Sequence, residues 1–268
     1  MLSIDSLISI RLFSFLSAFL FFAAWEMAAP RRALQTPKGG RWFRNLSITI
    51  LDGLAGRFVL PLQGAALAVV AGQQGWGLFN QLDVPSLPAG ILSLVLLDLA
   101  IYLQHVMFHN VPILWYFHGM HHTDLDVDVT TGTRFHPIET VLSLLIKMGL
   151  IVVLGIPPWS FVAFEILLNV TSMFNHSNIA IGRAAERILR LIVVTPDMHR
   201  VHHSVVIREH NSNFGFNLPW WDRLFHTYKD QPDAGHDAMV IGLANFRDAE
   251  KLGLVRLMLM PLIERKKF

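Results

Sequence analysis

The sequence contains no cysteine. This absence excludes disulfide bonds, thiolate-bound iron–sulfur clusters, zinc sites with cysteine ligands and cysteine nucleophiles. The chain also lacks the G-x-G-x-x-G pattern of dinucleotide-binding folds. Any metal site must therefore be built from nitrogen and oxygen ligands, and no flavin or nicotinamide site is predicted.

Charged residues are scarce as well. They make up 16% of the 268 residues, against about 25% in ordinary soluble domains, whereas 53% of the residues are hydrophobic. The formal net charge is only +2, and no array of basic and aromatic residues suggests a nucleic-acid partner. The surplus of apolar residues instead indicates an integral membrane protein.

The apolar residues lie in runs long enough to cross a bilayer. The first run, residues 7–29, is longer than the apolar region of a signal peptide, which favours a retained helix over a cleaved leader. Residues 57–73 and 87–102 form the next two runs. Residues 138–175 hold two more runs, and the Pro-Pro pair between them cannot continue a helix, so a helical hairpin is predicted. Lys147 and Glu165 inside these runs leave a partly re-entrant pair as an alternative.

The basic residues predict the orientation. Five of them follow the first run: Arg31, Arg32, Lys38, Arg41 and Arg44. The positive-inside rule then predicts residues 31–55, 105–137 and 176–268 on the cytoplasmic side. The segment 183–195 and the basic C-terminal tail are too short to span, and they are predicted to be interfacial helices.

These features predict an all-α integral membrane protein with four to five membrane helices and a cytoplasmic helical cap. The cap is rich in histidine, and its histidine motifs predict that it holds a two-metal centre. The expected divisions are N-terminal membrane helices in residues 1–90, a catalytic region in residues 91–230 and a C-terminal interfacial tail in residues 231–268.

Histidines carry the strongest functional signal, because they recur at helical spacings. His105 and His109 form an H-x-x-x-H pair, and two H-x-x-H-H motifs follow: His118, His121, His122, and then His199, His202, His203. Residues three and four apart share one face of a helix, so each motif can aim two or three imidazoles at one point. Neutral imidazole binds iron, zinc, copper and nickel. Eight such residues exceed the need of one tetrahedral zinc, which predicts two metal ions.

Several acidic and amide residues stand near these motifs. A ligating histidine usually donates its second N–H to a carboxylate or carbonyl, so these residues are candidates to orient the ligands. The candidates are Asp98, Asp124, Asp126, Asp128, Glu139, Asn175, Asp197 and Asn213. For Asp98 an interfacial position, and for the DLDVD stretch a solvated loop, are equally open alternatives. Arg134 is expected either to hold a lipid head group or to pair with one of the acids.

The ordered series HVMFH, HGMHH, RFHPIE, FNHSN, DMHRVHH and NSNFGFNLPWWDRLFHTY resembles the fatty acid hydroxylase / sterol desaturase superfamily. The resemblance covers roughly residues 90–230. Within the superfamily, the stretches TTGTRFHPIE and TPDMHRVHHS are most similar to the bacterial sterol desaturase group, which implies a bacterial inner membrane. The resemblance implies two iron ions, O2 as oxidant, a lipid substrate that enters from the bilayer and a separate redox protein as electron donor. It also implies that His176 is a ninth ligand, and that His136 is a ligand or a supporting residue.

The sequence departs from the superfamily at two positions. Gly119 stands where an arginine is common, and His226 stands where a glycine is usual. His210 and His236 have no counterpart and are expected at the surface.

Two other classes of protein remain as alternatives. One is a membrane zinc-dependent hydrolase, although none of the three histidine motifs contains the acidic base of H-E-x-x-H. The other is a non-enzymatic metal-binding or haem-binding membrane protein. Hydroxylation and desaturation of the lipid cannot be separated by the sequence, because both use the same machinery.

Overall fold

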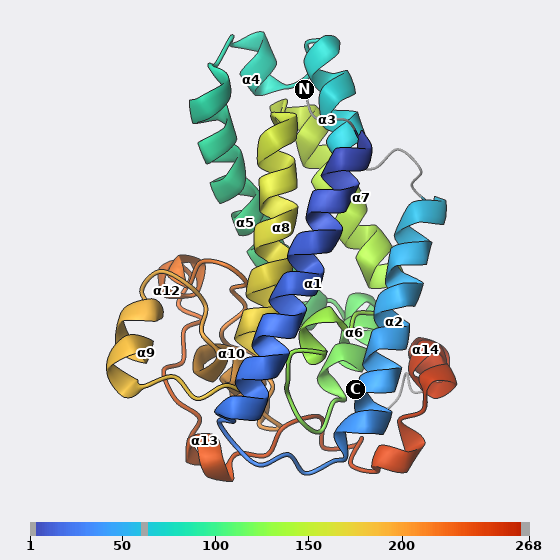
Figure 1. The fold of residues 1–268 in the computed structure, drawn as a ribbon, viewed down its shortest axis with the longest axis vertical. Coiled ribbons are helices and arrows are strands. Elements are labelled where there is room, and N and C mark those ends of the chain that lie inside the picture. Colours follow the sequence, from blue (N-terminus) through green and yellow to red (C-terminus); the bar gives the residue numbers. More distant parts are fainter. Residues whose placement is uncertain (1–3, 60–63, 264–268) are drawn as a thin grey trace.

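The structure is a computed structural model that describes residues 4–59 and 64–263. Over these two ranges it contains helices and no β-strand, which confirms the predicted all-α class. Long helices run along the longest axis of the molecule, and most of the short ones gather at one end, which we call the cap (Figure 1).

Six helices form the elongated part: α1 (Ile4–Ala28), α2 (Lys38–Val59), α3 (Gly64–Gln73), α5 (Ser86–Asn110), α7 (Pro137–Leu154) and α8 (Pro158–His176). The cap contains α6 (Pro112–His122), η1 (Thr131–Thr133), α9 (Arg183–Leu189), α10 (Pro196–His202), α11 (Ile207–His210), α12 (Trp220–Leu224), α13 (Gly235–Ala238), η2 (Ala249–Lys251) and α14 (Leu254–Ile263). The short α4 (Leu78–Gln81) lies at the opposite end, next to α3 (Figure 1).

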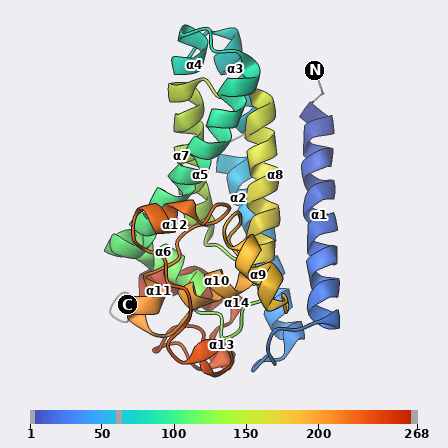
Figure 2. The same cartoon turned by 90° about the vertical axis from the view of Figure 1, so that its left-hand side faces the viewer.

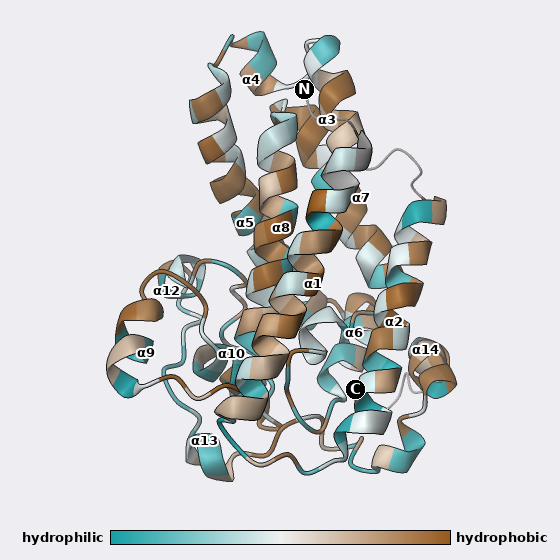
Figure 3. Ribbon diagram, in the orientation of Figure 1, coloured by the Kyte–Doolittle hydropathy of each residue, from teal (hydrophilic) through white to brown (hydrophobic). Residues whose placement is uncertain are grey.

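Four stretches of the described helices are long and apolar enough to cross a membrane: Ser9–Ala28, Lys38–Gln81, Ser86–Asn110 and Pro137–Leu154. The second runs across residues 60–63, which lie outside the described residues. Helix α8 lies beside α5 and α1 and extends over the same length (Figures 1 and 2). Apolar residues cover much of the long helices, while polar residues are frequent in the cap (Figure 3).

The prediction for residues 31–55 is wrong in one respect. This stretch was expected to be a cytoplasmic loop before a span at 57–73, whereas α2 already begins at Lys38 and packs along α7. Its polar residues Arg41, Asn45 and Asp52 are buried against the protein. The low hydropathy of α2 therefore reflects polar contacts within the protein rather than exposure to water.

The predicted hairpin of residues 138–175 is confirmed. Helix α7 ends at Leu154, where Gly155 adopts a left-handed conformation with φ 75°, and Pro158 starts α8. The two charges inside the hairpin pair with each other, because Lys147 Nζ lies 2.5 Å from Glu165 Oε1. Both helices are continuous, and the candidate spans include α7 but not α8.

Candidate metal centre

All nine predicted ligands meet in the cap and form two groups. The five-histidine group contains His105, His109, His118, His122 and His202. The four-histidine group contains His121, His176, His199 and His203. Within each group the candidate ligand atoms lie within 4.8 Å of one another. All nine side chains are buried except His109, which is partly exposed.

Each H-x-x-H-H motif was expected to direct two or three imidazoles at one point. The first and last histidines of each motif do share a group, but its two adjacent histidines point into different groups. His121 belongs to the four-histidine group and His122 to the five-histidine group, with ring centroids 5.2 Å apart. Adjacent residues of a helix differ by about 100° in direction, which produces this split. Each motif therefore contributes to both groups and holds them side by side.

The ring nitrogens show that these groups suit cations. The Nδ1 atom of His121 lies 2.9 Å from the carbonyl of Arg134, and that of His176 lies 2.7 Å from the carbonyl of Ser172. A carbonyl only accepts hydrogen bonds, so both Nδ1 atoms carry the proton and both Nε2 atoms carry a lone pair. Yet these two Nε2 atoms lie 3.1 Å apart. A shared cation would remove the repulsion between the lone pairs.

The five-histidine group shows the same arrangement. His105 donates Nδ1–H to the carbonyl of Phe214 at 2.7 Å, and the Nδ1 of His118 lies 2.7 Å from the Glu139 carboxylate. Their Nε2 atoms lie 3.1 Å apart. The Nε2 atom of His202 is buried without a hydrogen-bond partner among the described residues. The donor set therefore fits metal ions that accept nitrogen ligands.

The segment 211–216 orients three of these rings. It supplies the Asn211 side chain to His109 at 3.2 Å, the Ser212 carbonyl to His202 at 2.7 Å and the Phe214 carbonyl to His105. The buried carboxylate of Asp222 fixes this segment, since it accepts the backbone N–H groups of residues 214 and 215 at 2.7 and 2.8 Å. This role could not be predicted from the sequence, because every residue type has the same backbone carbonyl.

The segment 131–139 orients the histidines of α6. The Arg134 carbonyl accepts from His121, the Phe135 ring stacks on His121 with centroids 4.7 Å apart, and Glu139 contacts His118. Among the acidic and amide candidates, Glu139 is the one whose side chain the described structure places in hydrogen-bond contact with a ring of either group. The Asn213 side chain instead donates to the carbonyls of Met198 and Lys229.

The other candidates stabilise the framework around the histidines instead. Asp98 accepts from Trp221 Nε1 at 2.8 Å, and Asn175 donates to the Phe216 carbonyl at 3.0 Å. Asp197, in the first turn of α10, contacts Arg31 at 3.2 Å and also pairs with Arg200. Except for the pair of Asp197 with Arg200 within α10, each bond joins elements distant in the sequence, so these residues hold the histidine-bearing helices in place.

The DLDVD stretch is buried rather than solvated. Asp124 and Asp128 both contact the buried Arg41 guanidinium, at 2.8 and 2.5 Å. Arg134 lies 3.6 Å from Asp124 and is fully enclosed, so it pairs with an acid and does not face lipid. The pKa of Asp124 is lowered because the positive charges of Arg41 and Arg134 outweigh the effect of burial, which alone would raise it. Asp126 accepts from the backbone N–H groups of residues 35 and 36.

Four histidines lie outside the two groups, at positions 136, 210, 226 and 236. His136 caps α7, with Nδ1 accepting from the Ile138 N–H at 3.2 Å and Nε2 bonded to the Met258 carbonyl at 3.1 Å. Both of its nitrogens are therefore engaged away from either group. The prediction that His210 and His236 lie at the surface is wrong, because they are only 7% and 6% exposed.

His210 and His236 are buried for different reasons. The His210 ring lies beside the five-histidine group, with its centroid 4.4 Å from that of His122. His236 faces Asp197, with its Nε2 atom 3.7 Å from the carboxylate. His226, where the superfamily usually has glycine, has a φ of 59°, the left-handed region that glycine adopts without strain.

The histidines of α6 and α10 are held in the neutral form. Burial, reinforced by neighbouring imidazoles, lowers the pKa of His121, His122 and His203 well below the ordinary value. Burial lowers the pKa of His118 to about 3. Neutral imidazole is the form that binds metals, so the rings are ready to bind without losing a proton.

We expect the protein to lose stability and metal when the pH falls from about 8 to about 5. The folded-state pKa values lie below the unfolded value of about 6.5, so below that pH the unfolded chain binds more protons and unfolding is favoured. The change is up to about 1.4 kcal/mol per pH unit for each such histidine. Thermal unfolding and metal content, measured on the same detergent-solubilised protein across this range, check the expectation. A melting temperature that does not change between these pH values would contradict it.

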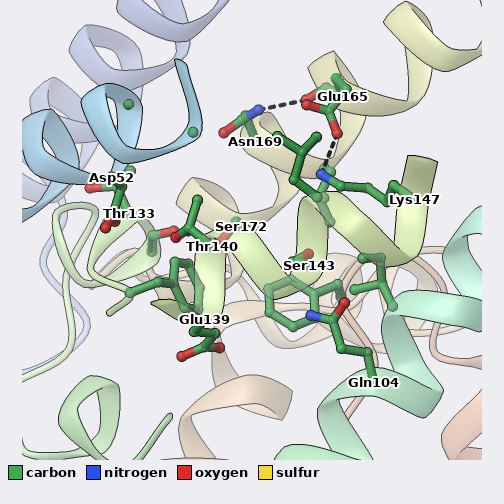
Figure 4. Close-up of a pocket in the computed structure, with 18 of the residues that line it drawn as sticks. Asp52, Gln104, Thr133, Glu139, Thr140, Ser143, Lys147, Glu165, Asn169 and Ser172 are labelled. Atoms are coloured by element: carbon green, nitrogen blue, oxygen red, sulfur yellow. Dashed lines mark hydrogen bonds and ion pairs between the residues drawn. The ribbon is translucent and has the colours of Figure 1, made fainter. Parts of the chain in front are cut away.

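A cavity of about 340 Å³ lies between α1, α2, α5, α7 and α8. His105 and His118 of the five-histidine group line one end. Towards the other end the lining includes Lys147, Glu165 and Asn169, which Figure 4 shows on the opposite side of the cavity from Glu139. The cavity therefore connects the interior of the membrane helices with one of the two candidate metal sites.

Residues 90–227 match the family model for fatty acid hydroxylases. The chain belongs to this family. The resemblance inferred from the histidine motifs is therefore confirmed. Searches of solved structures find no significant match.

Curated relatives match about half of the chain. An ornithine lipid hydroxylase of Rhizobium tropici is 32% identical over 142 residues, which are 53% of this chain and 42% of the relative. The alkylglycerol monooxygenase of Homo sapiens is 30% identical over 148 residues, 55% of this chain and 31% of the relative. The alkylglycerol monooxygenase of Xenopus tropicalis is 32% identical over 137 residues, which are 51% of this chain and 30% of the relative. The chain thus matches less than half the length of each of these relatives.

Proposed function

We propose that this membrane protein is an O2-dependent lipid hydroxylase with a di-iron centre. The observation that carries the proposal is the pair of adjacent histidine groups with converging Nε2 atoms, one of which lies at the end of a cavity within the membrane helices. The names of the relatives support the choice of reaction, since hydroxylases and monooxygenases both insert oxygen. For the same reason we favour hydroxylation over desaturation.

The nine histidines of the two groups would hold the two ions, and iron is one of the metals that imidazole ligands suit. Iron bound there would supply the oxidation of an unactivated lipid C–H bond by O2. The chain's own residues provide orientation and a dry environment. Carbonyls of residues 134, 172, 212 and 214 fix ring orientation, and Phe135 and Phe216 line the cavity at the histidine end.

The reaction needs electrons, and we propose that a separate redox protein delivers them. We place the protein in a bacterial inner membrane with the cap facing the cytoplasm, where such a donor could reach it. The basic residues that follow α1 favour this orientation by the positive-inside rule.

We expect a cysteine introduced at Gly75 to react with an impermeant thiol reagent applied to intact cells, and one at Lys229 not to react. Gly75 lies in the turn between α3 and α4 at the end opposite the cap, and Lys229 lies in the cap. The sequence has no native cysteine, so the labelling has no background from this chain. Labelling at Lys229 alone would show that the cap faces outward.

The activity is tested with isotopically labelled O2. Protein purified with reductant and without chelator should contain about two iron ions per chain and show no haem absorbance. Cells that express it should incorporate label into a membrane lipid, and cells that express His202→Ala should not. Zinc-only protein that hydrolyses an ester or amide without O2 would contradict the proposal and favour a hydrolase. If the same lipids are labelled in cells with and without the protein, that result would also contradict the proposal.

A further inference from the structure

The cavity carries charged residues at the end remote from the histidines. Glu165 contacts both Lys147, at 2.5 Å, and Arg11, at 2.8 Å, and its backbone carbonyl accepts from Asn169. Lys147 and Glu165 are 8% and 6% exposed. All four residues line the cavity (Figure 4 shows three of them). Charged residues within membrane helices are costly, which makes a functional role the default interpretation.

We propose that this end of the cavity binds the oxyanion of a single-chain lipid substrate. Lys147 and Arg11 would face the anion, and Glu165 would position both cations. This inference rests on the function proposed for the histidine end. It adds the chemical class of the substrate, and it puts the head group of the substrate at the end of the cavity remote from the histidines.

The charge balance supports the proposal. Two cations share one carboxylate, so Lys147, Arg11 and Glu165 together carry a net charge of +1 at this end of the cavity. Lys147 and Glu165 are buried, and the Arg11 side chain is 32% exposed. A carboxylate or phosphate in the cavity would neutralise this net charge.

The rest of the lining would orient the substrate. The acids Asp52 and Glu139 also line the cavity, and Glu139 lies at the histidine end, where it contacts His118. About 12 Å of helix rise separates Lys147 from Glu139 on α7. A negatively charged head group is therefore expected at the Lys147 end of the cavity rather than at the end that carries the acids. The C–H bond near the histidines would then belong to the chain, well away from the head group.

The size of the cavity limits the substrate. At about 340 Å³ it lies near the lower end of ligand cavities, which span about 300–1,000 Å³. This space suits one hydrocarbon chain better than a complete two-chain phospholipid.

A binding assay on the full chain in detergent micelles tests the proposal without turnover. Radiolabelled palmitate is displaced by palmitate, hexadecyl phosphate or hexadecanol, which distinguishes a carboxylate from a phosphate and both from a neutral head group. We expect at least one of the two anionic lipids to bind roughly tenfold or more tightly than the alcohol, the effect of one charge-assisted contact. Lys147→Gln should remove this preference, and Lys147→Arg should retain it. Arg57→Gln, which removes a helix cation outside the cavity lining, is the matched control.

Equal binding of the three lipids by the unmodified protein would overturn the proposal. So would a Lys147→Gln protein that binds all three less well by the same factor, because that result indicates a purely structural ion pair. If Lys147→Gln fails to fold, the preference for anionic lipids over the alcohol, measured on the unmodified protein and on Lys147→Arg, still tests the proposal. A preference for an anionic lipid without oxygen incorporation would refute the oxygenase and leave this site standing.

Discussion

His202→Ala should reduce lipid hydroxylation by about a hundredfold or more, and His121→Ala should do the same, although the two residues lie in different histidine groups. Even the loss of a residue that only supports a ligand typically costs 10- to 100-fold, and the loss of a ligand should cost at least as much. Each variant lacks one ligand of one group, so each should retain about one of two iron ions. Metal analysis and turnover measured on the same preparation check both expectations.

The double variant distinguishes one centre from two independent sites. Groups that act as a unit show non-additive losses, so His121→Ala combined with His202→Ala should be no less active than either single variant. His226→Asn is the control, since His226 is exposed and asparagine tolerates the same left-handed backbone. Single variants that keep both ions and lose activity only severalfold would show that these two residues are not ligands.

Gly132→Ala should have the second-largest effect, destabilising the protein and lowering its metal content. A Cβ atom at Gly132 would lie 2.4 Å from the carbonyl oxygen of Ser172 and 2.8 Å from its carbonyl carbon, and these backbone atoms cannot move independently of α8. The clash would separate η1 from α8, and hence the carbonyl of Arg134 from the carbonyl of Ser172. These two carbonyls orient His121 and His176. We expect a loss of about 1–3 kcal/mol, the usual cost of overpacking.

Gly149→Ala provides the matched control for this substitution. Gly149 lies within α7, and no atom lies within 4 Å of a Cβ built there. Alanine is the better helix former by about 1 kcal/mol, so this variant should be as stable as the parent or more stable. Thermal unfolding and metal content of both variants give the comparison. If Gly132→Ala also keeps the parental melting temperature and metal content, the close contact between η1 and α8 is not required.

The candidate aspartates show the limit of a prediction that rests on residue type and closeness in the sequence alone. A carboxylate near a histidine in the sequence is a reasonable hydrogen-bond acceptor for it, but Asp124 and Asp128 bind Arg41 instead. Arg41 had been interpreted only as one charge of a cytoplasmic loop. The pairing depends on α2 packing against the cap, and a contact between residues so far apart in the chain has no local signal.

The buried pair of Lys147 and Glu165 illustrates the same limit. In the sequence, each charge weakens the expectation of a membrane helix. In the structure they neutralise each other across the hairpin, and Arg11 of α1 joins them. Only the ion pairs that join α7 to α8 and α1 to α8, together with the packing of α1 against α8, show that the charges are compatible with continuous helices.

The sequence by itself determined the class of the protein and the set of histidines that meet. Composition and long apolar runs predict membrane helices, and spacings of three and four residues place imidazoles on shared helix faces. The tertiary structure alone decided which histidine joins which group. Adjacent histidines diverge by about 100°, and their partners come from other helices. It also decided which atoms orient the rings, because most of these are backbone carbonyls brought close by folding and are the same in every residue type.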